Sequence, residues 1–169
     1  MITVRYVRMM AAYNSEMNRR IYEAAGRLTD AQRREDVGLF FKSLHGTLNH
    51  LLWGDRQWMS RFDGWPPNAI SIKESPTLFD DFEAMRDERR SADQKIEDFA
   101  ARIDDQWLLE DLVWFSGAAK VELRRRKDGL IVHFFNHQTH HRGQAHAALT
   151  QRGLAPGDTD LFLLVAPDA

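Results

Sequence analysis

The sequence predicts an all-α protein, a four-helix bundle with a small β-hairpin inserted before its last helix. Two observations lead to this fold class. Apolar residues recur every three or four positions over four long stretches, which is the period of a helix buried on one side. A short segment before the last stretch instead alternates apolar and charged residues, as half-buried strands do. Because 169 residues is the length of one ordinary domain, we expect residues 1–169 to form a single bundle.

The composition limits both location and chemistry. The 23 basic and 25 acidic residues nearly balance, which argues against a duplex-DNA binder, and we interpret the basic run at 124–127 as solvated charge. The apolar runs are too short to span a membrane, and the N-terminus lacks the pattern of a signal peptide, so we expect a cytoplasmic protein. The absence of cysteine removes thiol nucleophiles and thiolate ligands. Any metal must therefore be held by nitrogen and oxygen.

The first stretch predicts a helix that ends near Gly26, and Thr29 or Asp30 is expected to cap a short turn after it. The positions that define this helix are Val7, Met10, Asn14, Met17, Ile21, Ala24 and Leu28.

The second helix is expected to cover about Phe40 to Phe62, and it has apolar residues on two sides. One side is formed by Phe41, Leu44, Leu48, Leu52, Met59 and Phe62. The opposite side is formed by Leu39, Gly46, His50, Trp53 and Gln57. A helix of this kind is usually buried on both sides. We therefore expect one side to face the core and the Leu44–Leu48–Phe62 face to form the contact of a homodimer.

The remaining elements follow in order. Residues 63–76 are expected to form a loop, and Thr77 to cap a third helix whose charged middle, residues 86–95, faces water. Its apolar positions are Leu78, Phe82, Met85, Ile96, Phe99 and Ile103. A hairpin is expected at 112–125 with its turn at 116–119, and the last helix at 130–151. The apolar tail "DLFLLVAPDA" is expected to pack back on the bundle.

Three histidines of the last helix, His133, His137 and His141, lie four residues apart on one stripe. Two histidines at this spacing can share one ion, but the outer two are roughly 12 Å apart along the axis. The ligand pair is therefore His133 with His137 or His137 with His141, and the third ligand must come from the second helix, where His45 and His50 are the candidates. The alternatives are an ordinary polar helix face or a core histidine with a satisfied hydrogen bond.

Two known metal motifs are absent. Gln138 occupies the position that a glutamate would need for the H-E-x-x-H motif of metalloproteases. An E-x-x-H pair, which a diiron carboxylate bundle requires, does not occur anywhere in the sequence.

The segments "TLNHLLWGDRQW" (47–58) and "FFNHQTHHRGQ" (134–144), with the early "YNSEMN" (13–18), resemble the DinB family of metal-binding four-helix bundles. The resemblance implies that His50, His137 and His141 bind one divalent transition metal, which would be nickel, zinc, iron or manganese. The chain departs from the family at Glu16 or Met17, where a tryptophan is common.

Relatives of this kind use the metal to activate low-molecular-weight thiols, and the family is named for induction by DNA damage. The resemblance therefore implies a metal-dependent enzyme with a small-molecule substrate, either a thiol-dependent S-transferase or a hydrolase. The alternative is a non-catalytic stress protein in which the ion is structural or sensed. Because the chain has no cysteine, any thiol would be supplied as a cofactor or substrate.

Five further residues are expected near the ligands. Gln144 continues the ligand stripe and is placed to orient a water. Asp55 and Arg142 are interpreted as supporting residues, with a buried ion pair as the alternative for Asp55. Gln57 and Trp53 share the His50 side and are expected to wall the pocket, with plain core packing as the alternative for Trp53. We also expect Gly143 to permit close helix packing.

Overall fold

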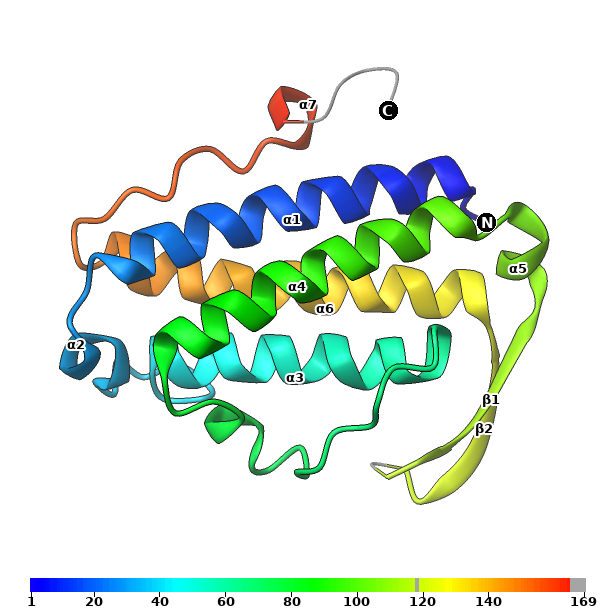
Figure 1. Ribbon diagram of the computed structural model, residues 1–169, viewed down its shortest axis with the longest axis horizontal. Helices are drawn as coiled ribbons and strands as arrows, with labels where there is room; N and C mark the ends of the chain where they lie inside the picture. The colour runs from blue at the N-terminus through cyan, green and yellow to red at the C-terminus, as the bar shows by residue number, and fades with distance from the viewer. Residues whose placement is uncertain (118, 165–169) are drawn as a thin grey trace.

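The computed structural model describes residues 1–117 and 119–164, within which four long helices pack together (Figure 1). A two-stranded antiparallel hairpin precedes the last of them, so the predicted fold class is confirmed. The long helices are α1 (Val4–Gly26), α3 (Leu44–Phe62), α4 (Phe82–Arg102) and α6 (Lys127–Thr150). The shorter elements are α2 (Asp30–Arg34), the 3₁₀ turn η1 (Ser75–Thr77), α5 (Asp105–Leu109), β1 (Asp111–Ser116), β2 (Val121–Arg126) and α7 (Leu161–Leu164).

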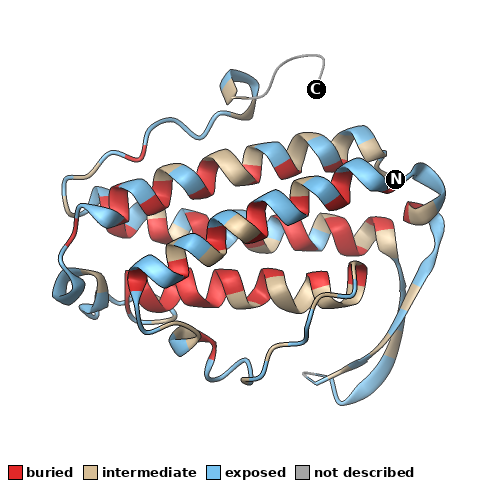
Figure 2. Cartoon of the chain, in the orientation of Figure 1, coloured by how far each residue is buried: buried red, intermediate tan, exposed pale blue. Residues whose placement is uncertain are grey.

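The buried faces of the long helices meet in the middle of the bundle (Figure 2). Two apolar clusters fill it. The cluster at the hairpin end contains Phe62, Phe99 and Phe134, and the cluster at the α2 end contains Leu48 and Phe82. Each such side chain contributes about 1.5–3 kcal/mol on burial. The core is thus divided into two apolar halves.

A buried polar layer lies between the two apolar halves. Arg89 of α4 donates a hydrogen bond to Asp55 of α3, and its Nη2 lies 2.8 Å from Oδ1 of Asp93. Gln138 of α6 donates to Asp55 at 2.9 Å, and Asn18 of α1 donates to Asp93 at 2.8 Å. Burial raises the pKa of both carboxyls, and the Arg89 guanidinium opposes that shift. All four long helices are therefore joined by polar contacts in one layer.

This layer corrects the expectation that the charged middle of the third helix faces water. Arg89 is 2% exposed and Asp93 6% exposed. Their charges are tolerated because they pair with each other and with Asp55, as buried charges must. The helix also starts later than predicted, at Phe82. Asp81 is its N-cap, and its Oδ1 accepts from the backbone N–H of Ala84 at 2.7 Å.

Two other boundaries differ from the prediction by a few residues. Helix α3 begins at Leu44, not Phe40, because the Ser43 hydroxyl caps it and Lys42 before it has a positive φ of 66°. Helix α6 begins at Lys127, directly after β2. Thr77 lies in η1, whereas the predicted cap at Thr29 is confirmed at the start of α2.

The hairpin and the tail are mostly exposed. Trp114 pairs with Leu123 in the β1–β2 register. The predicted turn at 116–119 includes Ala118, which lies outside the described residues, as do 165–169 of the tail. Phe162 and Leu163 in α7 are 79% and 61% exposed, so the expectation that the tail packs on the bundle is wrong for these two. Within the described ranges, no helix combines the length and apolar character needed to cross a membrane.

The predicted subunit contact is also corrected. Leu44 is 2% exposed, Leu48 is 0% exposed and Phe62 is 8% exposed, all inside the chain's own core. This face therefore cannot form a homodimer contact. Dimerisation itself stays a prediction.

The polar layer generates a stability prediction. We expect Arg89→Met to lower the free energy of unfolding by about 3–5 kcal/mol, because the substitution leaves two carboxylates buried without a cation. Urea denaturation followed by circular dichroism measures this change. The matched control is Arg90→Met on the exposed side of α4, which should change the free energy by less than about 0.5 kcal/mol. Equal losses in the two variants would contradict the role assigned to the layer.

Candidate metal centre

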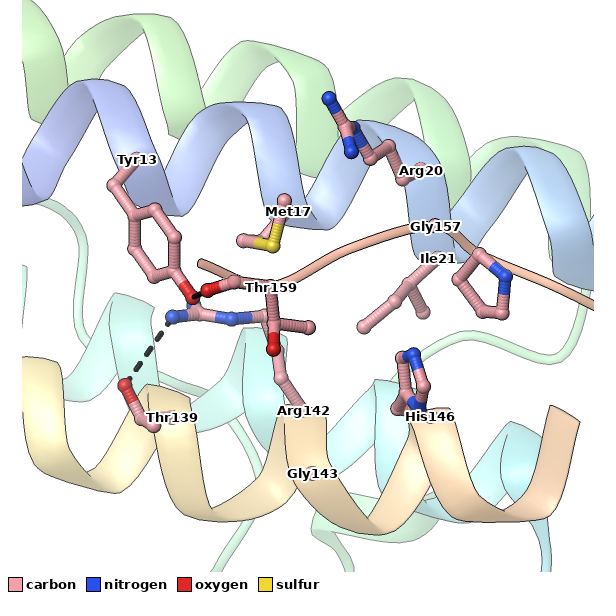
Figure 3. Close-up of a pocket in the computed structure, with 11 residues that line it drawn as sticks. Tyr13, Met17, Arg20, Ile21, Thr139, Arg142, Gly143, His146, Gly157 and Thr159 are labelled. Carbon is pink, nitrogen blue, oxygen red and sulfur yellow. Dashed lines mark hydrogen bonds between the residues drawn. The ribbon is translucent and has the colours of Figure 1, made fainter. Parts of the chain in front are cut away.

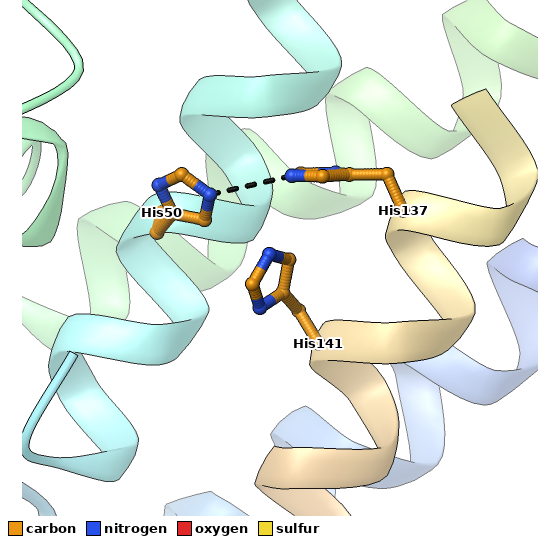
Figure 4. Close-up of side chains that lie close together, drawn as sticks. All are labelled: His50, His137 and His141. Atoms are coloured by element: carbon orange, nitrogen blue, oxygen red, sulfur yellow. Dashed lines mark hydrogen bonds between the residues drawn. The ribbon is translucent and has the colours of Figure 1, made fainter. Parts of the chain in front are cut away.

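Three histidines from two helices meet near the middle of the bundle (Figure 4). His50 comes from α3, and His137 and His141 come from α6, one turn apart. One nitrogen of each lies within 4.8 Å of the other two, and Nε2 of His50 is 3.3 Å from Nε2 of His137. The structure therefore brings together the three residues that the resemblance indicated.

The competing histidines lie elsewhere. The His133 ring packs edge-on against Trp58, with a centroid distance of 5.1 Å, and is 6.2 Å from the His137 ring. His45 is buried, and its Nε2 donates to the backbone carbonyl of Phe79 at 3.0 Å. His45 thus corresponds to the ordinary core histidine that the sequence left open as an alternative.

Hydrogen bonds fix the tautomers of two of the three rings. The Ser75 hydroxyl donates its single hydrogen to the carbonyl of Ile72 at 2.7 Å. Its oxygen must therefore accept from Nδ1–H of His50, which lies 2.8 Å away. Nδ1–H of His141 similarly donates to the amide oxygen of Gln144 at 2.8 Å. Both rings are left with a bare Nε2, which is the form that binds a metal.

Burial keeps the three rings neutral. It lowers the pKa of His50 to about 4, with a further contribution from the neighbouring His141. It lowers the pKa of His137 to about 3, and the nearby histidines add to the shift. The pKa of His141 is also lowered by burial, while the Gln144 contact opposes the change. Neutral imidazole is the ligand form of histidine.

The three side chains fit a divalent transition metal. Two nitrogens bound at about 2.0–2.1 Å to a tetrahedral ion lie about 3.3 Å apart, as the Nε2 atoms of His50 and His137 do here. Nδ1 of His137 is buried and has no hydrogen-bond partner among residues 1–117 and 119–164, so this ring, unlike the other two, is not oriented by a hydrogen bond from its second nitrogen. Three imidazoles alone do not identify the metal, and they leave coordination positions open.

Gly54 is a structural requirement that the sequence did not indicate. A Cβ at this position on α3 would lie 2.6 Å from Cε1 of His137, closer than real contacts allow. The His137 ring therefore occupies the space that any other residue at position 54 would fill.

Aromatic rings wall the site on the α3 side. The Phe41 ring stacks on His50 with a centroid distance of 3.8 Å and lies 5.5 Å from the His141 ring. Trp53 lies parallel to His50 at 6.1 Å, and its indole N–H donates to the carbonyl of Ile70. Trp53 thus lies beside the site as predicted, whereas sequence reasoning missed Phe41 and Ser75 as neighbours of His50.

The other predicted neighbours have different roles. Asp55 forms the buried ion pair with Arg89, the alternative that the sequence allowed. The amide oxygen of Gln57 accepts from Asn68 at 3.4 Å, and among the described residues Gln57 makes no hydrogen bond to the three histidines. Arg142 is buried and donates to Asn14 on α1. Gly143 was expected to permit close packing, but no atom of the described chain lies within 4 Å of a Cβ built there.

Comparison with known proteins gives two matches. The sequence profile of the DinB family matches residues 1–167. "Protein DinB" of Bacillus subtilis (strain 168) is 26% identical over 160 residues, which cover 89% of this chain and 88% of that protein. The profile thus spans every element that positions the three histidines.

The close approach at Gly54 predicts a specific effect on the metal centre. Gly54→Ala should displace the His137 ring and weaken binding of added Zn²⁺ by about tenfold or more, while the helical circular dichroism spectrum is retained. Gly143→Ala is the matched control. It should leave the affinity unchanged and raise the free energy of unfolding by about 0.5–1 kcal/mol, because its Cβ meets open space. Titration calorimetry with Zn²⁺ compares the two, and equal affinities would refute the prediction.

Proposed function

Because this chain belongs to the DinB family, we propose that His50, His137 and His141 bind one divalent transition metal at a catalytic centre. The observation that carries the proposal is the convergence of three imidazole nitrogens within 4.8 Å, from two buried histidines and the half-buried His137. The bare Nε2 atoms of His50 and His141 support it, since each ring has its other nitrogen engaged by a neighbour.

The reaction class follows from the coordination that three ligands leave open. A metal held this way lowers the pKa of a bound water or binds a thiolate, which suits a hydrolase or a thiol-dependent S-transferase acting on a small molecule. With no cysteine in the chain, a low-molecular-weight thiol would come from outside. Neighbouring side chains orient and surround the three histidines. Gln144 holds the His141 ring in place, and the rings of Phe41 and Trp53 pack against His50.

One observation favours a second candidate, in which the ion is structural. The ligands come from two different helices, and Phe41 stacks closely on one of them. An ion here would link α3 to α6 whether or not it takes part in turnover. We place this second because the two apolar clusters hold the same helices together without the ion.

Metal content tests the ligand assignment. Untagged protein should carry about one ion per chain by mass spectrometry, as expected for one three-histidine site. His137→Ala should lose the ion, since it removes the central ligand, and His133→Ala should retain it, since that ring packs on Trp58. Protein that stays empty after incubation with zinc, nickel, iron and manganese, or equal loss in both variants, would refute the assignment.

Chelation separates the catalytic role from the structural one. We expect protein stripped with a chelator to keep its helical circular dichroism spectrum and a cooperative thermal transition, because both apolar clusters remain. Loss of helical signal at 25 °C in the stripped protein would assign the ion to the structural role. Activity with thiol-transfer and hydrolase substrates is then expected only from the metal-loaded protein.

A further inference from the structure

A second cavity lies between α1, α6 and the segment that follows α6 (Figure 3). Its volume is about 230 Å³, and none of the three histidines of the metal centre lines it. Met17, Ile21 and Pro156 give it an apolar side, while Arg142 and Thr139 are on its α6 side. The cavity is therefore a separate feature of the molecule with both apolar and charged walls.

Arg142 is the unusual residue of this cavity. It is only 4% exposed, yet within the described ranges no carboxylate lies within 4.0 Å of its guanidinium. It donates to two neutral oxygens, those of the Asn14 amide and, at 3.4 Å, the Thr139 hydroxyl, and its Cζ lies 5.7 Å from the centroid of the Tyr13 ring. Arg89, which is equally buried, touches two carboxylates. Burying a cation without a counterion is costly, so the contrast between the two arginines calls for an explanation.

The charge balance of the polar layer explains only part of this contrast between Arg89 and Arg142. The two arginines, Arg89 and Arg142, match Asp55 and Asp93 in number, and the Asn14 amide lies between Arg142 and Asp93. Both carboxylates, however, contact Arg89, so that Arg142 is connected to Asp93 only through the Asn14 amide. The side chain also borders an open cavity, which a purely structural cation does not need.

The cavity is formed in advance by contacts of its own covering segment. The Tyr13 hydroxyl donates to the carbonyl of Thr159 at 2.7 Å, and Arg20 Nη1 donates to the carbonyl of Asp158 at 3.3 Å. Pro156 is buried against the bundle. A preformed cavity with an apolar side and a few convergent polar groups is typical of a small-molecule site. Arg20 also lines the cavity, but it is paired with Glu16, so Arg142 is the lining arginine without a carboxylate contact among the described residues.

We propose that this cavity binds a small organic anion, a carboxylate on a short apolar body. The carboxylate would pair with Arg142, and the apolar body would lie against Met17, Ile21 and Pro156. The volume is sufficient, because cavities of about 150 Å³ already admit benzene. The site is distinct from the metal centre and does not depend on the function proposed for it.

Titration calorimetry with hexanoate tests the proposal. Hexanamide has the same shape without the charge, and it should bind about tenfold more weakly or worse, since a charge-assisted hydrogen bond is lost. The measurement is repeated on His137→Ala, in which a carboxylate cannot bind through the metal centre. Hexanoate binding should persist there at about one molecule per chain, so that failure of the metal proposal and failure of this one remain distinguishable.

A cavity-filling variant locates the site without disturbing the polar layer. Gly143 lines the cavity, and a Cβ built on it meets no atom of the described chain within 4 Å, so Gly143→Leu fills the cavity from α6. We expect this variant to lose hexanoate affinity at least about tenfold. Gly129→Leu is the matched control on the same helix, because Gly129 is equally open and does not line this cavity.

Five results would overturn the proposal. They are an absence of hexanoate binding, loss of that binding in His137→Ala, equal affinities for hexanoate and hexanamide, full binding to Gly143→Leu, and binding of inorganic phosphate as tight as that of hexanoate. The last result would show that the site recognises charge alone.

Discussion

The hydrogen bond from Gln138 to Asp55 is the contact on which the rest of the structure depends. It joins α3 to α6 inside the core, where a polar group without its partner would be costly. Each of its two residues is the chain neighbour of a residue of the metal centre: Gly54 precedes Asp55, and His137 precedes Gln138. Fixing this bond therefore fixes where the His137 ring meets α3. Arg89 and Asp93 connect Asp55 to α4 and α1 in the same way. The position of the three histidines therefore depends on how all four long helices are aligned.

The repeat of apolar residues was sufficient to predict the four long helices and their order. It failed at the helix ends, where capping decides the boundary, as at Ser43 and Asp81. It also failed in the middle of α4. A run of alternating charges has the same appearance whether it faces water or contains a buried pair, and the difference depends on Asp55, which is 34 residues from Arg89 in the sequence. The two-sided pattern of α3 was read as burial on both sides. Leu44, Leu48 and Phe62 on one side are buried in the chain's own core, but on the other side Trp53 and Gln57 are only half-buried.

Spacing alone left the ligand set of the candidate site open, and the family resemblance narrowed it. Helix geometry placed His137 and His141 one turn apart, but it could not decide between His45 and His50. That choice depends on Ser75, a loop residue whose hydroxyl orients the His50 ring, and loop residues leave no periodic signal. Gly54 was missed for a related reason. A glycine inside a helix has many explanations, and only the approach of a ring from another helix identifies the one that applies.

The long sequence separation between His50 and His137, 87 residues, has a consequence for how an ion would respond to the state of the chain. In an unfolded chain, His137 and His141 remain close, but bringing His50 to them requires closing that long loop. The entropy of such closure is roughly 4 kcal/mol, from (3/2)RT ln n, or about a thousandfold in affinity. The folded bundle presents all three rings with this closure already made, so it offers them at a high effective concentration. Tight chelation by all three rings would therefore report that the first and second halves of the chain are correctly joined.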